Sequence, residues 1–167
     1  MKNIYCISTV LIAVSICLVW SATNVTPSEQ CEGQNFEGLR ERIQVIPCTK
    51  KGCRLRKGTN TTVIFKFKPK HEVTTLINDV YAIVAGLPLP FLGVTGVSAC
   101  PQVTRSSDGS PAPCPLAAGE EYTYSNVFPI ESFYPNVDLR VHWALLDGKK
   151  NVICFEVPAV ITPAKKH

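Results

Sequence analysis

The 167-residue sequence lacks the compact motifs of the common catalytic and nucleotide-binding sites. It contains no HExxH, no GxSxG nucleophile elbow, no P-loop, no GxGxxG fingerprint and no aspartate-rich calcium loop. Histidine is scarce, with three residues, and only His142 lies in a clear strand pattern, on its polar face, where we interpret it as a surface residue. The neighbouring Glu120 and Glu121 would point to opposite faces of a strand, which excludes a paired-carboxylate mechanism. We therefore expect neither an enzyme nor a metal or cofactor site.

Charge is also limited, at 18% charged residues and a net charge of +4, and no nucleic acid partner is expected. No internal repeat, low-complexity tract or interior linker divides the chain. The basic residues gather in two clusters, which are Lys50, Lys51, Arg54, Arg56 and Lys57, and then Lys66, Lys68 and Lys70. Such clusters are either a solvated face or a weak attraction to anionic membrane headgroups, worth about 1 kcal/mol per residue near the surface.

A long apolar run occupies the start of the sequence, from Ile4 to Trp20 after Lys2, and small residues follow it. This pattern is typical of a secretory signal peptide. A signal anchor is the alternative, but hydroxyl residues dilute the run and no basic stop-transfer cluster follows. We predict a signal peptide over residues 1–21 and one secreted domain over residues 22–167. Sequons for N-glycosylation at Asn24 and Asn60 fit the same route.

Six cysteines remain after the leader, an even set that suits an oxidising compartment. Loop-closure entropy favours the close pairs Cys48–Cys53 and Cys100–Cys114, which leaves Cys31–Cys154 for the longest loop. A zinc site is the alternative, but the CxxC-like pairs with a nearby histidine that structural zinc requires are missing. The longest loop should gain about 5 kcal/mol from its cross-link. Paired cysteines leave no thiol nucleophile.

Short alternating apolar segments separated by turn-rich breaks predict an all-β fold. The clearest is Val137–Leu145, in which every second residue is apolar before Asp147-Gly148. Further strands are expected at Ile43–Ile46, Val63–Phe67, Tyr122–Val127 and Val152–Val157.

Two segments are harder to interpret. Residues 77–85 also fit a helical stripe, but their β-branched content favours a strand, which brings the total to about seven. The proline-rich segment 98–115, which contains Cys100 and Cys114, is predicted to be a tethered surface loop.

Eight short strings now identify a likeness to a known family. They are VIPC ending at Cys48, CRLRKG from Cys53, GLPLPF from Gly86, CPL from Cys114, YTYSN from Tyr122, FYP from Phe133, VHWALLD from Val141 and CFEVP from Cys154. From Cys31 to Ile161 the chain resembles the ML (lipid-recognition) domain family, in its Niemann-Pick type C-2 or epididymal secretory branch. The resemblance implies an immunoglobulin-like two-sheet sandwich with an internal apolar cavity, the same three disulfides, and a role in carrying sterols or other lipids between membranes.

The resemblance also implies which residues line that cavity. Carried over by position, they are Val45, Val63, Phe65, Leu89, Phe91, Ile130, Tyr134 and Trp143, with Phe91, Ile130 and Tyr134 at the mouth. The residues alone favour ordinary sandwich core for Val63, Phe65 and Trp143. Phe91 and Tyr134 instead lie beside prolines at loop positions, where large apolar groups are typical of a rim.

Three departures from the family pattern leave the ligand class open. The loop between Cys100 and Cys114 is longer and richer in proline, Phe155 replaces a frequent tryptophan, and Thr61 stands where an aromatic residue lines the cavity. We predict a monomeric carrier for one apolar lipid, either a sterol, a fatty acid or a similar molecule. It would be secreted or reside in the endosomal or lysosomal lumen, and contact anionic membranes or a membrane sterol transporter. The alternative is a lipid-recognition protein in innate immune or chemosensory signalling with a receptor partner.

Overall fold

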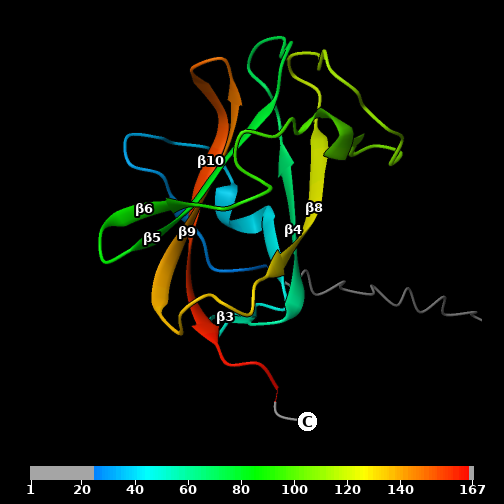
Figure 1. Ribbon diagram of the computed structural model, residues 1–167. Helices are drawn as coiled ribbons and strands as arrows, with labels where there is room; N and C mark the ends of the chain where they lie inside the picture. The colour runs from blue at the N-terminus through cyan, green and yellow to red at the C-terminus, as the bar shows by residue number, and fades with distance from the viewer. Residues whose placement is uncertain (1–24, 166–167) are drawn as a thin grey trace, which may run out of the picture.

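A computed structural model describes residues 25–165, and the predicted signal peptide, Cys6, Cys17 and the sequon at Asn24 lie outside that range (Figure 1). The elements are β1 (Glu29–Gln30), η1 (Leu39–Glu41), β2 (Ile43–Ile46), β3 (Cys53–Arg56), β4 (Thr59–Phe67), β5 (Ile77–Val84), β6 (Leu87–Pro90), η2 (Cys100–Gln102), β7 (Val103–Arg105), β8 (Tyr122–Ile130), β9 (Asp138–Asp147) and β10 (Lys150–Thr162). The two η elements are single 3-10 turns. Within the described residues no helix is long and apolar enough to cross a membrane.

The strands form two sheets that lie face to face (Figure 1). One sheet has six strands in the order β1-β10-β9-β5-β6, with β3 also paired to β10, and the other has four in the order β2-β4-β8-β7. The predicted all-β sandwich is confirmed. The predicted number of about seven strands is wrong, because the described chain has ten. The strands that the sequence pattern missed, β1, β3, β6 and β7, have two to four residues each, too few for a clear alternation.

Strand β10 organises the six-stranded sheet. One of its edges pairs antiparallel with β9, while the other pairs antiparallel with β1 and then parallel with β3. Pro158 lies between these last two stretches, after the Glu29–Glu156 pair and before the Cys53–Ala159 pair. Proline has no N–H to donate to a neighbouring strand, so a long strand tolerates it at this gap between the β1 and β3 pairings.

The core lies between the sheets because alternate residues of the long strands point inward. On β9 these include Leu139, Val141 and Trp143, all buried, and β4 and β8 contribute matching rows. Phe65 is central, since its ring stacks on Tyr124 of the same sheet at 4.8 Å and meets Phe155 of the other sheet at 5.1 Å. These contacts cross the space between the two layers.

The two doubtful segments resolve differently. Residues 77–84 form strand β5, as predicted, and pair antiparallel with β9. The segment 98–115 is more than a loop, because Val103–Arg105 pair with β8 as edge strand β7. Its prolines lie outside that strand, so a proline-rich segment can still contribute an edge strand to the four-stranded sheet.

All three predicted disulfides are present, which rules out the zinc alternative for these cysteines. Cys31–Cys154 joins the residue after β1 to β10 across a separation of 123 residues. Cys48–Cys53 connects the end of β2 in one sheet to the start of β3 in the other. Cys100–Cys114 closes the segment around β7.

Candidate functional site

Two small apolar voids lie in the sandwich, and we call them the outer void and the inner void. The outer void has a volume of about 80 Å³ and is lined by Ala82, Val84, Leu89, Pro90, Phe91, Tyr134, Pro135, Val137, Leu139 and Ile161. The inner void has about 10 Å³ and is lined by Val45, Cys53, Leu55, Val63, Phe128, Val141, Trp143, Phe155 and Val157. Strands of both sheets enclose the inner void, whereas the outer void lies at the β5, β6 and β9 side of the six-stranded sheet.

Phe91 lies where the two voids approach one another. Its ring meets Phe128, which lines the inner void, at 5.5 Å edge to face, and meets Tyr134, which lines the outer void, at 6.3 Å. The backbone holds the ring there, because the Phe91 N–H donates to the Val80 carbonyl and its own carbonyl accepts from Val94 and Thr95. The Phe91 ring therefore borders the outer void and contacts a side chain that lines the inner one.

The structure divides the eight predicted cavity residues into three groups. Val45, Val63 and Trp143 line the inner void, and Leu89, Phe91 and Tyr134 line the outer one. Phe65 and Ile130 line neither, and both are fully buried. An exposed rim is therefore the wrong picture for Ile130 and for Phe91, which is 5% exposed.

Other lining residues escaped the sequence prediction although a signal for them was present. Leu139 and Val141 belong to the apolar face of β9, so the same alternation that placed Trp143 inward also indicates them. Phe128 and Ile161 continue the buried rows of β8 and β10, but they lie beyond the strand ends predicted at Val127 and Val157.

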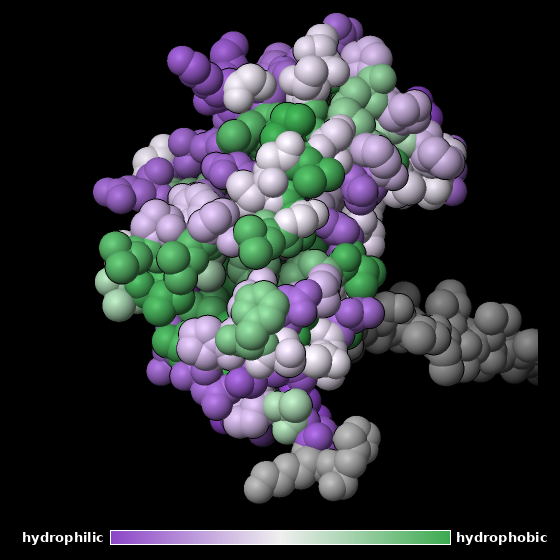
Figure 2. Space-filling model, in the orientation of Figure 1, coloured by the Kyte–Doolittle hydropathy of each residue, from purple (hydrophilic) through white to green (hydrophobic). Residues whose placement is uncertain are grey.

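Exposed apolar side chains surround the outer void. Leu87 and Leu89 are exposed on β6, Leu92 follows Phe91, and Phe133 precedes Tyr134. Figure 2 shows the corresponding hydrophobic surface over the hairpin of β5 and β6. One basic residue lies close by, since the ammonium group of Lys57 donates to the Tyr134 carbonyl at 3.1 Å. The outer void thus opens beside an apolar surface with a lysine at its border.

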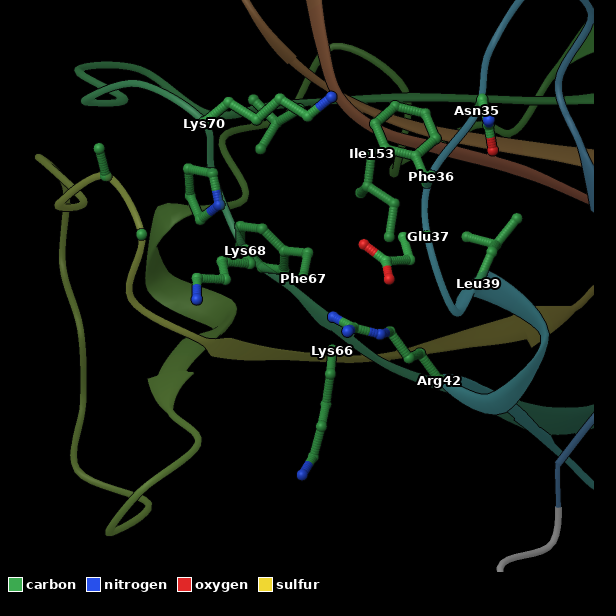
Figure 3. A pocket seen from close by; sticks show the side chains of 14 residues that line it. Asn35, Phe36, Glu37, Leu39, Arg42, Lys66, Phe67, Lys68, Lys70 and Ile153 are labelled. Carbon is green, nitrogen blue, oxygen red and sulfur yellow. The ribbon is translucent and has the colours of Figure 1, made fainter.

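A larger hollow, which we call the basic groove, lies elsewhere. It has a volume of about 720 Å³, an apolar floor that includes Phe36, Leu39, Phe67 and Ile153, and cationic walls formed by Arg42, Lys66, Lys68 and Lys70 (Figure 3). Glu121 accepts ion pairs from Arg42 at 3.6 Å and Lys66 at 3.7 Å, both partly exposed and of small energetic value. Charged walls and an open shape make the groove a poor site for an uncharged lipid.

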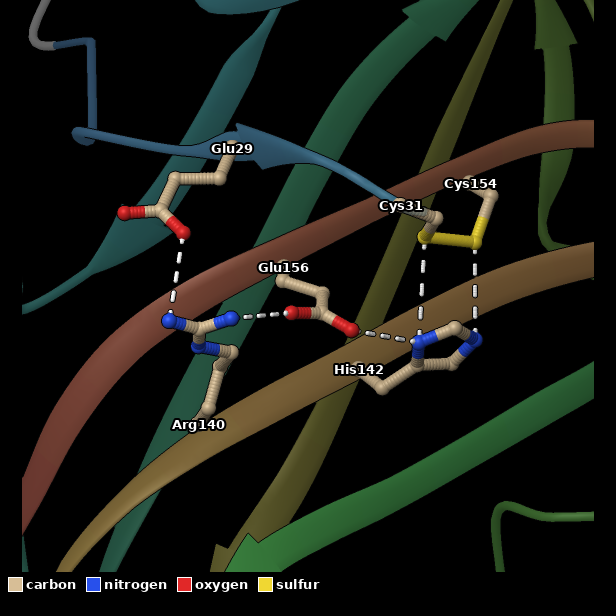
Figure 4. Close-up of polar contacts among 6 residues, drawn as sticks. All are labelled: Glu29, Cys31, Arg140, His142, Cys154 and Glu156. Carbon is tan, nitrogen blue, oxygen red and sulfur yellow. Dashed lines mark hydrogen bonds and ion pairs between the residues drawn. A yellow bond between two sulfur atoms is a disulfide. The ribbon is translucent and has the colours of Figure 1, made fainter. Parts of the chain in front are cut away.

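His142 is only partly a surface residue, which corrects the sequence interpretation. Its imidazole is largely buried, stacks on Tyr81 at 4.2 Å, and has Nδ1 3.1 Å from a Glu156 carboxylate oxygen (Figure 4). Its Nε2 lies 3.4 Å from the Cys154 sulfur. The group of Cys31, His142 and Cys154 has metal-site spacing, but its sulfurs form a disulfide and are not thiolate ligands.

The polar groups at the centre of the sandwich are mostly paired. The Tyr124 hydroxyl donates to the Asn78 side-chain carbonyl at 2.7 Å, and the Asn78 amide donates to the Val97 carbonyl at 3.1 Å. Burial raises the pKa of Tyr124 to about 12, so the hydroxyl stays protonated. We find no nucleophile beside a general base in the two voids.

Comparison with known proteins agrees with this architecture. The sequence is 30% identical over 126 residues to mouse NPC intracellular cholesterol transporter 2, covering 75% of this chain and 78% of that protein. It is 28% identical over 109 residues to the ecdysteroid-regulated 16 kDa protein of Manduca sexta, covering 65% and 70%. The crystal structure of a Niemann-Pick type C2 protein from the Japanese carpenter ant superposes with a TM-score of 0.61 at 23% identity, covering 72% of this chain and 89% of that one. Residues 25–161 match the ML domain, and the chain belongs to the ML domain family.

Proposed function

We propose that this protein is a secreted carrier that binds one apolar lipid between its two β-sheets and solubilises or transfers it. The observation that carries the proposal is the pair of apolar voids, with the Phe91 ring in contact with lining residues of both. The names of the relatives support a sterol as one ligand, since several are cholesterol transporters. A fatty acid or a similar lipid would suit the same apolar lining.

The lipid must enlarge the space that it occupies. Ligand pockets usually measure about 300–1,000 Å³, whereas the two voids have about 80 and 10 Å³. Displacement of Phe91 joins them, and further room comes from separation of the sheets. A ligand that buries about 500 Å² of apolar surface gains on the order of 12 kcal/mol before the costs of ordering and of opening the protein. Useful affinity therefore needs no charged contact.

The surface beside the outer void supports transient contact with anionic membranes during transfer. Leu87, Leu92 and Phe133 would enter the interfacial layer, while the basic residues of β3 and Lys57 would attract acidic headgroups. Asn60, the sequon inside the described residues, is exposed on β4 and would carry a glycan in a secreted protein.

Native mass spectrometry of the secreted protein, with extraction of the bound lipid, tests the proposal. We expect a one-to-one complex, either copurified or formed with cholesterol or palmitate delivered from cyclodextrin. The variant Ala82→Leu fills the outer void and should reduce the bound fraction, whereas Ala118→Leu adds the same atoms to the basic groove and should not. The reverse result would place the ligand in the basic groove. A protein that binds no lipid would contradict the function itself.

A further inference from the structure

Within residues 25–165, two polar side chains between the sheets lack any hydrogen-bond partner. They are the Nε1 of Trp143 and the hydroxyl of Thr61, in side chains that are 1% and 0% exposed. Other buried polar groups nearby are satisfied, as with Tyr124 on Asn78 and with the Thr26 hydroxyl, which accepts from the Val45 N–H at 2.8 Å. Since an unpaired buried polar group is costly, these two require a reason.

Trp143 borders the inner void, and Thr61 lies beside two of the residues that line it. Trp143 lines the void from β9, and its ring lies 5.6 Å from that of Phe128. Thr61 faces inward from β4 in the same row as Val63 and pairs in register with Phe128, and both of these neighbours line the void. The two groups therefore approach one region from opposite sheets.

Water is a poor partner for them. A water needs a space of at least about 10–15 Å³ and two to four polar neighbours, and the inner void has about 10 Å³ and an apolar lining. Any partner must come with a ligand that widens this space. An oxygen at the leading end of such a ligand would meet the Trp143 N–H as a donor and the Thr61 hydroxyl as a donor or acceptor.

We propose that the inner void is an oxygen-recognition site, and that the preferred ligand is an apolar lipid with a hydroxyl or carbonyl group at the end that enters first. This inference rests on the proposed carrier function and names the chemical class of its ligand. A pure hydrocarbon end leaves both groups unpaired, whereas an oxygenated end pairs them. Sites that hydrogen-bond a ligand oxygen discriminate strongly against the analogue that lacks it.

The test is a competition read by native mass spectrometry. One pair of probes is a side-chain-hydroxylated cholesterol, with a hydroxyl at each end, against cholestene, which has none. The other is a hexadecanediol with a terminal hydroxyl at each end against hexadecane. Because both ends carry oxygen, the orientation of the probe does not matter. The ratio of the two bound forms gives their relative affinity.

We expect Trp143→Phe, which keeps a ring but removes the N–H, to lower the preference for the hydroxylated probe about tenfold. Thr61→Val, which replaces the hydroxyl by a methyl group, should lower it in the same direction without loss of melting temperature. Val63→Ala is the comparison for volume, because it changes the same void without removing a polar atom, and it should change the ratio much less than either polar variant.

The outcomes separate the two proposals. Equal ratios in the parent and in both polar variants, or a Val63→Ala change as large as theirs, would overturn the oxygen site and leave the carrier function standing. If Trp143→Phe fails to fold, Thr61→Val decides alone. A parent protein that captures none of the four probes would overturn the carrier function, and this inference with it.

Discussion

Truncation of Phe91 to alanine should affect stability and lipid exchange together. The ring is 5% exposed and contacts Phe128 and Tyr134, so its loss belongs to the range of about 3–5 kcal/mol for a buried phenylalanine. The low end of this range applies, because the ring already borders a void and has fewer packing contacts to lose. At about 2–4 °C per kcal/mol for a chain of this size, the melting temperature should fall by roughly 6–12 °C.

Exchange of a bound lipid should become faster in the same variant. If release requires the ring to leave its two aromatic neighbours, at about 0.5–1.5 kcal/mol each, the barrier falls by roughly 2 kcal/mol. This corresponds to a rate about 30-fold higher, measured by stopped-flow transfer of a fluorescent sterol to acceptor vesicles.

Val127 on β8 supplies the control. It is 56% exposed and lines neither void, so Val127→Ala should change neither the melting temperature nor the rate of transfer to acceptor vesicles. A lower melting temperature for Phe91→Ala with an unchanged exchange rate would refute a role of Phe91 in lipid release and leave it as a core residue. An unchanged melting temperature would refute the burial on which the estimate depends.

Three further predictions concern the disulfides, the basic strand and the core. Replacing both cysteines of one disulfide by alanine should lower the free energy of unfolding in the order of loop length. The expected losses are about 5, 3 and 2 kcal/mol for separations of 123, 14 and 5 residues, measured by chemical denaturation. A different order would contradict the chain-entropy account. Reversing the charges of Arg54 and Arg56 on β3 should slow lipid transfer to anionic vesicles at low salt but leave equilibrium affinity unchanged, and equal rates would reject a docking role. Because burial raises the pKa of Tyr124 from 10.0 to about 12, the unfolded chain loses this proton first as the pH rises, so stability should fall by about 3 kcal/mol across that window. In denaturation curves, Tyr124→Phe should remove this share of the loss of stability at alkaline pH. The same dependence of stability on pH in the variant and the parent would contradict the prediction.

The long strands were predictable because their signal lies within one stretch of sequence. The disulfides were predictable because six cysteines allow few pairings. On β9 the residues Leu139, Val141 and Trp143 alternate with polar neighbours, so a single stretch of sequence identifies the inward face. The cysteines form a small set in which loop length ranks the pairings.

The short edge strands and the lining of the voids were not predictable in the same way. Strand β1 has two exposed residues and exists only because β10 offers an unpaired edge. Phe128 and Ile161 become void residues through pairings between distant segments. The unpaired state of the Trp143 N–H is likewise a property of its three-dimensional surroundings, which no local pattern of the sequence indicates.

The position of the Cys48–Cys53 disulfide limits how the two layers could part around the proposed lipid. It joins β2 and β3 at one edge of the sandwich, whereas contacts such as Tyr124 with Asn78 and Phe91 with Phe128 hold the opposite edge without a covalent bond. If the proposed lipid parts the sheets, the joined edge would act as a hinge and the gap would widen towards β6 and β7. The inner void, which Cys53 lines, would then gain less width than the outer void. A space that opened in this way would be a wedge, and it would select molecules by their taper.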